Sequence, residues 1–128
     1  MRLLLDTHVA LWALTDHKNL SAEARALLLN TENDVYFSAA SVWEIAIKHA
    51  LARRDMPLSG DEARVLLLEA GYKELAITSE HAAATESLPH HHADPFDRIL
   101  LAQSKLEPMR LMTHDRQLLS YGDFVQWV

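Results

Sequence analysis

The chain has 128 residues, of which 49% are hydrophobic, enough to bury one core and too few to suggest two, so we expect a single domain over 1–128. It contains no cysteine, which excludes disulfides, thiolate catalysis and Cys-based zinc or iron–sulfur sites and makes a reducing cytoplasm the simplest expected setting. The net charge of −6 argues against a large basic face for nucleic acid, but it does not exclude a small nuclease whose bound metal ions offset its acids.

The first half of the chain alternates short apolar or β-branched runs with runs at helical spacing. Asp6 ends the apolar run after Arg2 within a few residues, so this run fits a buried strand and not a signal peptide. Ser21 is placed to cap a helix start, with Glu23 near the positive helix end. The expected strands are 2–5 and 34–38, and the expected helices are 8–14, 21–30 and about 40–50.

The second half continues the alternation. Gly71 is placed to end one helix, and Pro95 suits the first turn of another. The segment 88–95 is predicted to be a loop, and no stretch approaches the ~20 apolar residues that span a bilayer, so no membrane insertion is expected. The expected helices are 61–70, 79–87 and 95–104, and the expected strands are 74–77, 110–113 and 124–128.

Strands that alternate with helices predict an α/β fold. Such chains form parallel sheets that helices cover on both faces, with right-handed crossovers between neighbouring strands. We therefore expect a three-layer α/β/α sandwich with a mostly parallel sheet of about five strands.

Four acids, Asp6, Glu44, Asp97 and Asp115, stand where a predicted strand ends or a predicted helix begins. In an open parallel sheet the functional crevice lies outside the carboxyl ends of the strands. One α/β fold could therefore bring all four acids to the same edge of the sheet, which is the layout of a metal-dependent nuclease site.

Four carboxylates in one pocket need a counter-charge. Two unit charges about 4 Å apart repel by roughly 4 kcal/mol at an effective dielectric near 20. Either some acids hold protons through raised pKa values, or a divalent cation lies among them. We favour the cation, and carboxylate oxygens without cysteine suit Mg²⁺ or Mn²⁺ better than zinc.

Each acid also has a purely structural explanation. Asp6 could cap the helix that follows the first strand, and Asp115 could cap a short helix near the C-terminus. Ser41 and Glu44 have the spacing of a capping box, and Asp97 lies in a first helical turn, where the helix dipole favours an acid. Four unrelated caps on one predicted edge are nevertheless harder to explain than one shared site.

Histidines lie near several of these acids. His90, His91 and His92 form a consecutive tract, and adjacent histidines on a loop more often face solvent than share a metal, so their role is left open. His8 and His114 stand beside site acids and could contact substrate, tune a carboxylate or face solvent as exposed imidazoles.

The other candidate side chains give weaker signals. Thr7 and Thr113 could support the site through their hydroxyl groups or act as caps, whereas Trp12 and Trp43 are expected to pack the core more than to stack bases. Three glycines form neither of the common phosphate-binding motifs. Six cations are candidate phosphate contacts, although most are expected to be solvated surface charges: Lys48, Arg53, Arg54, Arg98, Arg110 and Arg116.

The order of the segments DTHVALW, SVWEIAIK, DPFDRILLAQ and LMTHD resembles the PIN-domain ribonucleases, in particular the VapC-type toxins. The likeness covers nearly the whole chain. It implies that the four acids above are the catalytic and metal-binding set, with no expected acid missing. Asp94 would be an accessory acid and Arg98 an accessory cation, and His114 stands where many relatives carry Asn or Arg.

The resemblance implies a Mg²⁺- or Mn²⁺-dependent endoribonuclease, the toxin of a type II toxin–antitoxin pair. It also implies a homodimer that a small antitoxin protein inhibits by inserting a segment into the acidic site. Two alternatives stay open: a catalytically silent PIN-fold binding module, and a phosphatase with Asp6 as nucleophile. His8 argues against the phosphatase, because a second Asp would be expected at that position.

Overall fold

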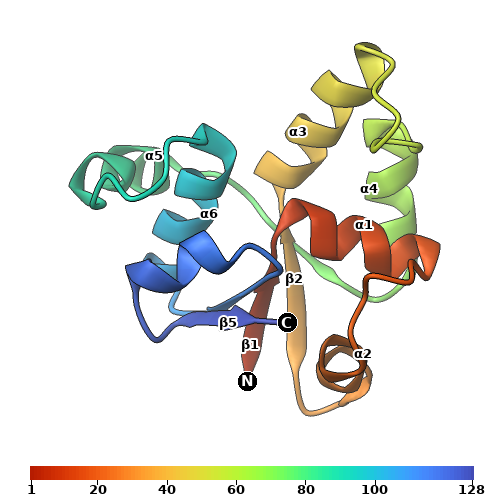
Figure 1. Cartoon of the computed structure of the whole chain (residues 1–128), viewed down its shortest axis with the longest axis horizontal. Coiled ribbons are helices and arrows are strands. Elements are labelled where there is room, and N and C mark those ends of the chain that lie inside the picture. Colours follow the sequence, from red (N-terminus) through yellow and green to blue (C-terminus); the bar gives the residue numbers. More distant parts are fainter.

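Five short strands form one parallel sheet in the centre of the molecule (Figure 1). The computed structural model describes all 128 residues. The strand order in the sheet is β3-β2-β1-β4-β5, and every neighbouring pair is parallel. The strands are β1 (Arg2–Leu5), β2 (Asp34–Ser38), β3 (Lys73–Leu75), β4 (Arg110–Thr113) and β5 (Val125–Trp127).

Helices cover both faces of this sheet. Figure 1 shows α5 and α6 on one side, with α1, α2 and α4 on the other. The α helices are α1 (Thr7–Thr15), α2 (Ala22–Leu29), α3 (Ala39–Ala50), α4 (Gly60–Glu69), α5 (Ser79–Ala84) and α6 (Pro95–Leu106). Two 3-10 helices, η1 (Thr85–Ser87) and η2 (Arg116–Tyr121), complete the chain. The predicted three-layer α/β/α sandwich with five strands is confirmed.

The apolar strands are buried on both faces, which explains their continuous hydrophobic runs. Leu3 and Leu5 of β1 pack in one core cluster with residues of α1, α2 and α4. Leu4 points to the opposite face and packs with Leu100 and Leu101 of α6. Both clusters meet at the central strand, so β1 is held rigidly between two helical layers.

Most predicted elements appear within a few residues of their expected bounds, with local differences. The strand expected at 74–77 is β3, which begins at Lys73 and ends at Leu75, and the helix expected to end at 104 continues to Leu106. Ser21 and Gly71 lie at the ends of α2 and α4 as expected, and Gly71 has φ +89°, a conformation that favours glycine. None of the helices combines the length and the hydrophobicity that crossing a membrane requires.

The register of the sheet brings three chain segments together at its carboxyl edge. Leu5 at the end of β1 pairs with Phe37 of β2 and with Met112 of β4. The amide of Asp6 continues this ladder by donating to the carbonyl oxygen of Met112 at 2.9 Å. Asp6 and Thr113, each next in the chain after one of these paired positions, therefore lie side by side above the sheet.

Candidate metal centre

Asp6 lies between β1 and α1 with both carboxylate oxygens engaged. One oxygen accepts from the amide of Val9 at 2.9 Å, so Asp6 does cap α1, and the other accepts from the hydroxyl of Thr113. The side chain is buried, and burial raises the pKa of Asp6 above its ordinary value despite these hydrogen bonds. A buried acid with a raised pKa lacks a full counter-charge. Asp6 can therefore cap α1 and also act as one of the site acids.

Thr113 couples two of the predicted site acids. Its hydroxyl donates to Oδ2 of Asp6 and accepts from the amide of Asp115 at 3.0 Å. This single buried side chain thus links the carboxyl ends of β1 and β4. Thr7 has a different place, because its hydroxyl donates to Oγ of Ser41 at 3.0 Å and ties α1 to α3.

Asp97 occupies the first turn of α6. The N-cap of this helix is Asp94, which accepts from the amides of Phe96 and Asp97 at 2.8 and 3.3 Å. Burial, followed by the charge of Asp94 and more weakly that of Asp6, raises the pKa of Asp97 to about 6. Asp94 therefore satisfies the helix end, while the carboxylate of Asp97 is left to face the centre.

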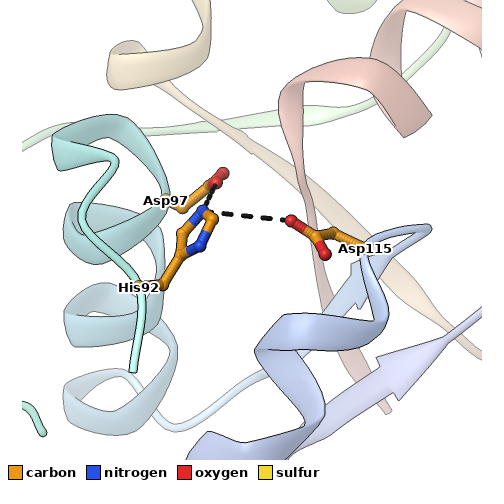
Figure 2. Close-up of side chains that lie close together, drawn as sticks. All are labelled: His92, Asp97 and Asp115. Carbon is orange, nitrogen blue, oxygen red and sulfur yellow. Dashed lines mark hydrogen bonds and ion pairs between the residues drawn. The ribbon is translucent and has the colours of Figure 1, made fainter. Parts of the chain in front are cut away.

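His92 and Asp115 complete a cluster around Asp97 (Figure 2). Nε2 of His92 lies 2.7 Å from Oδ2 of Asp97 and 3.9 Å from Oδ2 of Asp115. One ligand atom from each of the three residues lies within 4.8 Å of the other two. Asp115 also caps η2 by accepting from the amide of Gln117 at 2.9 Å. The three side chains come from a loop, from α6 and from the turn after β4.

Glu44 lies inside α3 and acts on Asp6. The helix begins at Ala39 with Ser38 as its N-cap, so the capping box suggested by the spacing of Ser41 and Glu44 is wrong. Glu44 is buried, and its Oε2 pairs with Nζ of Lys48 at 2.5 Å. The charge of Glu44 raises the pKa of Asp6, but burial of Asp6 raises it more. Glu44 is therefore close enough to act on Asp6 but has its own cation.

An open hollow of about 600 Å³ adjoins the acids between α1 and the segment that follows β4. Its lining residues are Asp6, His8, Trp12, His114, Asp115, Arg116 and Gln117. His114 packs between the rings of Trp12 and Trp127, at centroid distances of 5.3 and 5.4 Å, and the guanidinium of Arg116 lies over Trp127 at 4.1 Å. The hollow thus places a cation and several aromatic rings next to two site acids.

Most of the other candidate cations have structural partners. Arg98 donates to backbone carbonyls of the segment 85–92 and packs against the hydroxyl of Tyr121, so it holds a loop instead of facing the hollow. Arg53 pairs with Asp55, and Arg110 donates to the carbonyl of Asp123. Lys48 and Arg116 are therefore the cations that the fold brings to the acids.

Trp43 and His92 differ most from what the sequence suggested. Trp43 was expected to pack the core, but its side chain is 60% exposed and contacts Phe96 edge-on. His92 is brought to two acids although the tract gave no preference among its histidines. The only local signal was its position five residues before Asp97, and the loop path that makes the contact is set by Arg98.

The sequence of residues 3–123 matches the model of the PIN domain family. The chain belongs to the PIN domain family. No curated protein matches it in a sequence search. This PIN domain is also similar to chains in several solved structures, and the structural similarity shows a shared fold.

The first is VapBC2 from Rickettsia felis bound to a DNA fragment from its promoter, with a TM-score of 0.71, 12% identity, and coverage of 100% of this chain and 98% of that chain. The second is FitAcB from Neisseria gonorrhoeae, with a TM-score of 0.64, 24% identity and coverage of 98% and 96%. The third is VapBC-1 from nontypeable Haemophilus influenzae, with a TM-score of 0.63, 16% identity and coverage of 100% and 97%.

The donor atoms at this edge fit a divalent cation. Asp97 and Asp115 present carboxylate oxygens to a common point, with the buried Asp6 nearby, and His92 adds one imidazole nitrogen. Burial raises the pKa of Asp6 and of Asp97, and a bound cation would offset this cost by favouring the charged carboxylates. Oxygen-rich sets of this kind suit Mg²⁺ and Mn²⁺, and no cysteine is present to favour a softer metal.

Proposed function

We propose that this PIN domain is a metal-dependent endoribonuclease that hydrolyses RNA phosphodiester bonds with Mg²⁺ or Mn²⁺. One observation carries the proposal: Asp97 and Asp115, from separate elements, present ligand atoms to one point at the carboxyl edge of the sheet, beside the buried Asp6. The burial that raises the pKa of Asp97 to about 6 is unfavourable for a structural acid. It is expected for a group whose partner is a cation.

The four acids have distinct roles in this proposal. Asp97 and Asp6 are the main metal ligands, Asp115 is an outer or second-metal ligand, and Glu44 holds or orients the attacking water. When bound, the cation activates water, holds the scissile phosphate and stabilises charge on the attacking and leaving oxygens. The products carry a 3′-hydroxyl and a 5′-phosphate. Thr113 positions two acids at once through its hydroxyl group.

An RNA strand would enter through the hollow beside Asp6 and Asp115. Arg116 lies in this hollow and can neutralise one phosphate, and the ring of Trp12 offers an apolar surface to a base or sugar. The net charge of −6 is no obstacle to this arrangement, because two of the acids counted in it would be offset by the bound metal.

The same proposal makes the chain the toxin of a type II toxin–antitoxin pair. It is supported by a further similar solved structure, a toxin–antitoxin complex from Klebsiella pneumoniae, with a TM-score of 0.66 and 17% identity. An exposed apolar row on α3, formed by Trp43, Ile47 and Leu51 at exposures of 60%, 37% and 70%, is available for protein contacts. We assign this row to a homodimer and the acidic hollow to the cognate antitoxin.

A catalytically silent PIN-fold binding module is the second candidate. The contact between Glu44 and Lys48 favours it, because a glutamate that already has a cation is less available for a water or a metal. An aspartyl-phosphate phosphatase fits less well, because both carboxylate oxygens of Asp6 accept hydrogen bonds and a nucleophile needs a free one.

The test is cleavage of a mixed single-stranded RNA pool by the purified protein with Mg²⁺, Mn²⁺ or EDTA. An Asp97→Asn variant and an Asp123→Asn control are purified identically; Asp123 is exposed and belongs neither to the ligand cluster nor to the lining of the hollow. Cleavage that needs metal and is lost only in Asp97→Asn supports the nuclease. Equal cleavage by all three proteins would implicate a contaminant, and metal binding without any turnover would favour the binding module.

A further inference from the structure

We propose that His92 is a metal ligand of this centre through Nε2, which gives the site a mixed nitrogen and oxygen donor set that favours Mn²⁺ over Mg²⁺. The inference rests on the proposed metal-dependent function and adds to it a residue outside the four acids. Imidazole binds first-row transition metals well, whereas Mg²⁺ takes oxygen ligands almost exclusively. One histidine therefore changes which cation the site prefers.

The distances at the cluster fit ligands that share one ion. Nε2 of His92, Oδ2 of Asp97 and a carboxylate oxygen of Asp115 lie within 4.8 Å of one another. Ligand atoms held roughly 2.0–2.3 Å from one ion are at most about 4.6 Å apart, and Nε2 of His92 lies 2.7 and 3.9 Å from Oδ2 of Asp97 and Oδ2 of Asp115. Nε2 also points between the two carboxylates and not past them (Figure 2).

The other ring nitrogen of His92 has the partner that a metal-bound imidazole needs. Nδ1 lies 3.0 Å from Oε1 of Gln117, an oxygen that can only accept, so Nδ1 carries the hydrogen. This contact fixes the ring so that Nε2 faces the acids. Metal-binding histidines nearly always donate their second N–H to such an outer acceptor, which sets the ring orientation.

The loop that carries His92 is fixed by residues on the same elements as the acids. The guanidinium of Arg98, one residue after Asp97, donates to the carbonyl oxygens of His92 and Pro89 at 3.3 and 2.9 Å. The hydroxyl of Tyr121, at the end of η2, also donates to the carbonyl of Pro89 at 2.9 Å. The backbone of His92 is thus held in place before any metal binds.

The neighbouring histidines provide internal controls. His91 packs edge-on against the ring of Tyr121 with a centroid distance of 5.1 Å, and His90 is exposed. Neither joins the cluster of ligand atoms. Substitution of His91 or His90 therefore changes the same tract by one imidazole without removing the nitrogen that faces the acids.

The competing explanation is that His92 only pairs with Asp97 as a cation and leaves when metal binds. Two measurements without RNA separate the possibilities. Mn²⁺ and Mg²⁺ affinities are measured by calorimetry for wild type, His92→Gln, His91→Gln and Gln117→Leu. Pulsed electron paramagnetic resonance of bound Mn²⁺ then reports whether a nitrogen is coordinated, and circular dichroism confirms that each variant is folded.

We expect ¹⁴N coupling to bound Mn²⁺ in wild type and His91→Gln and none in His92→Gln. Mn²⁺ affinity should fall on the order of 10- to 100-fold in His92→Gln and by roughly tenfold in Gln117→Leu, with a smaller change for Mg²⁺. Bound Mn²⁺ without ¹⁴N coupling in wild type, or unchanged Mn²⁺ affinity in His92→Gln, would overturn the role of His92.

The proposed function can fail separately from this inference. If Asp97→Asn abolishes Mn²⁺ binding while His92→Gln leaves the affinity and the spectrum unchanged, the carboxylate centre stands and His92 is not a ligand. If wild type binds neither Mn²⁺ nor Mg²⁺, both proposals are wrong. If nitrogen coordination is seen but no RNA is cleaved, His92 is a ligand in a metal-binding module that lacks nuclease activity.

Discussion

Replacing Asp97 by Asn should stabilise the metal-free protein at neutral pH while it removes metal binding. Burial, then the charge of Asp94, raises the pKa of Asp97 from 3.8 to about 6, so the folded protein holds a proton there more tightly than the unfolded chain does. The stability that this group contributes is fully present below about pH 4 and is lost as the pH rises through about 6.

The size of the effect follows from the shift in pKa. A rise from 3.8 to about 6 corresponds to a cost of about 3 kcal/mol for the ionised carboxylate at pH 8. The side chain is 22% exposed, so solvent screens it only partly, and the figure already includes the favourable hydrogen bond from His92. The amide of the variant carries no charge, and because it can both donate and accept, it can still form a hydrogen bond with Nε2 of His92. We therefore expect a gain of up to about 3 kcal/mol.

The assay is urea unfolding of wild type and Asp97→Asn in EDTA from pH 4 to pH 8. The variant should be more stable by up to about 3 kcal/mol at pH 8, roughly 10 °C in Tm, and the difference should close towards pH 4. Saturating Mn²⁺ should then stabilise wild type and not the variant. A variant that is no more stable at pH 8, or equally more stable at pH 4, would refute the electrostatic reasoning.

Three further substitutions test other parts of the account. Thr113→Val should lower the free energy of unfolding by about 1–3 kcal/mol in urea and weaken Mn²⁺ binding in calorimetry, because the hydroxyl that links Asp6 to Asp115 is lost. As its control, Thr7→Val should change stability without changing metal affinity. Arg116→Ala, made in an inactive background, should weaken RNA binding in fluorescence anisotropy. It should also reduce the slope of log binding constant against log salt concentration by about one, because one phosphate contact is lost. Arg110→Ala should leave both the affinity and this slope unchanged. Trp43→Ser should convert a homodimer to a folded monomer in light scattering, and an unchanged mass would place the dimer contact elsewhere.

The fold was predictable because its signals are local and agree with one another. The run ended by Asp6, the cap at Ser21, the stop at Gly71 and the helix start at Pro95 each depend on a few neighbouring residues. The predicted bounds of β3 were wrong by one or two residues because β3 is a three-residue edge strand that pairs with β2 alone. Short edge strands have little hydrophobic alternation from which to set their bounds.

The capping box at Ser41 shows how a short motif can mislead. Ser38 and Ser41 both precede an apolar helical run, and only Ser41 has a glutamate three residues later. The structure uses Ser38 because β2 ends there and the chain must turn immediately to begin α3. Ser41 then lies inside the helix and receives a hydrogen bond from Thr7, and Glu44 turns towards Lys48.

The site was predictable only in outline. The positions of Asp6 and Asp115 after strands are enough to place them at one edge of a parallel sheet. The contact of His92 with Asp97, in contrast, depends on the path of the segment 85–92, whose carbonyl oxygens accept four hydrogen bonds from Arg98. No spacing rule relates a loop residue to a helix residue through a third side chain, so His92 could not be distinguished from its two neighbours in the tract.

Recording metal binding and cleavage in the same samples shows whether the metal held by the acids is the one that drives catalysis. Wild type and Asp97→Asn are titrated with Mn²⁺, and both the bound metal and the rate of RNA cleavage are recorded at each concentration. We expect cleavage by wild type to rise in step with metal occupancy, and the variant to show neither metal binding nor cleavage. Cleavage that persists in EDTA, or that is equal in the variant, would contradict it.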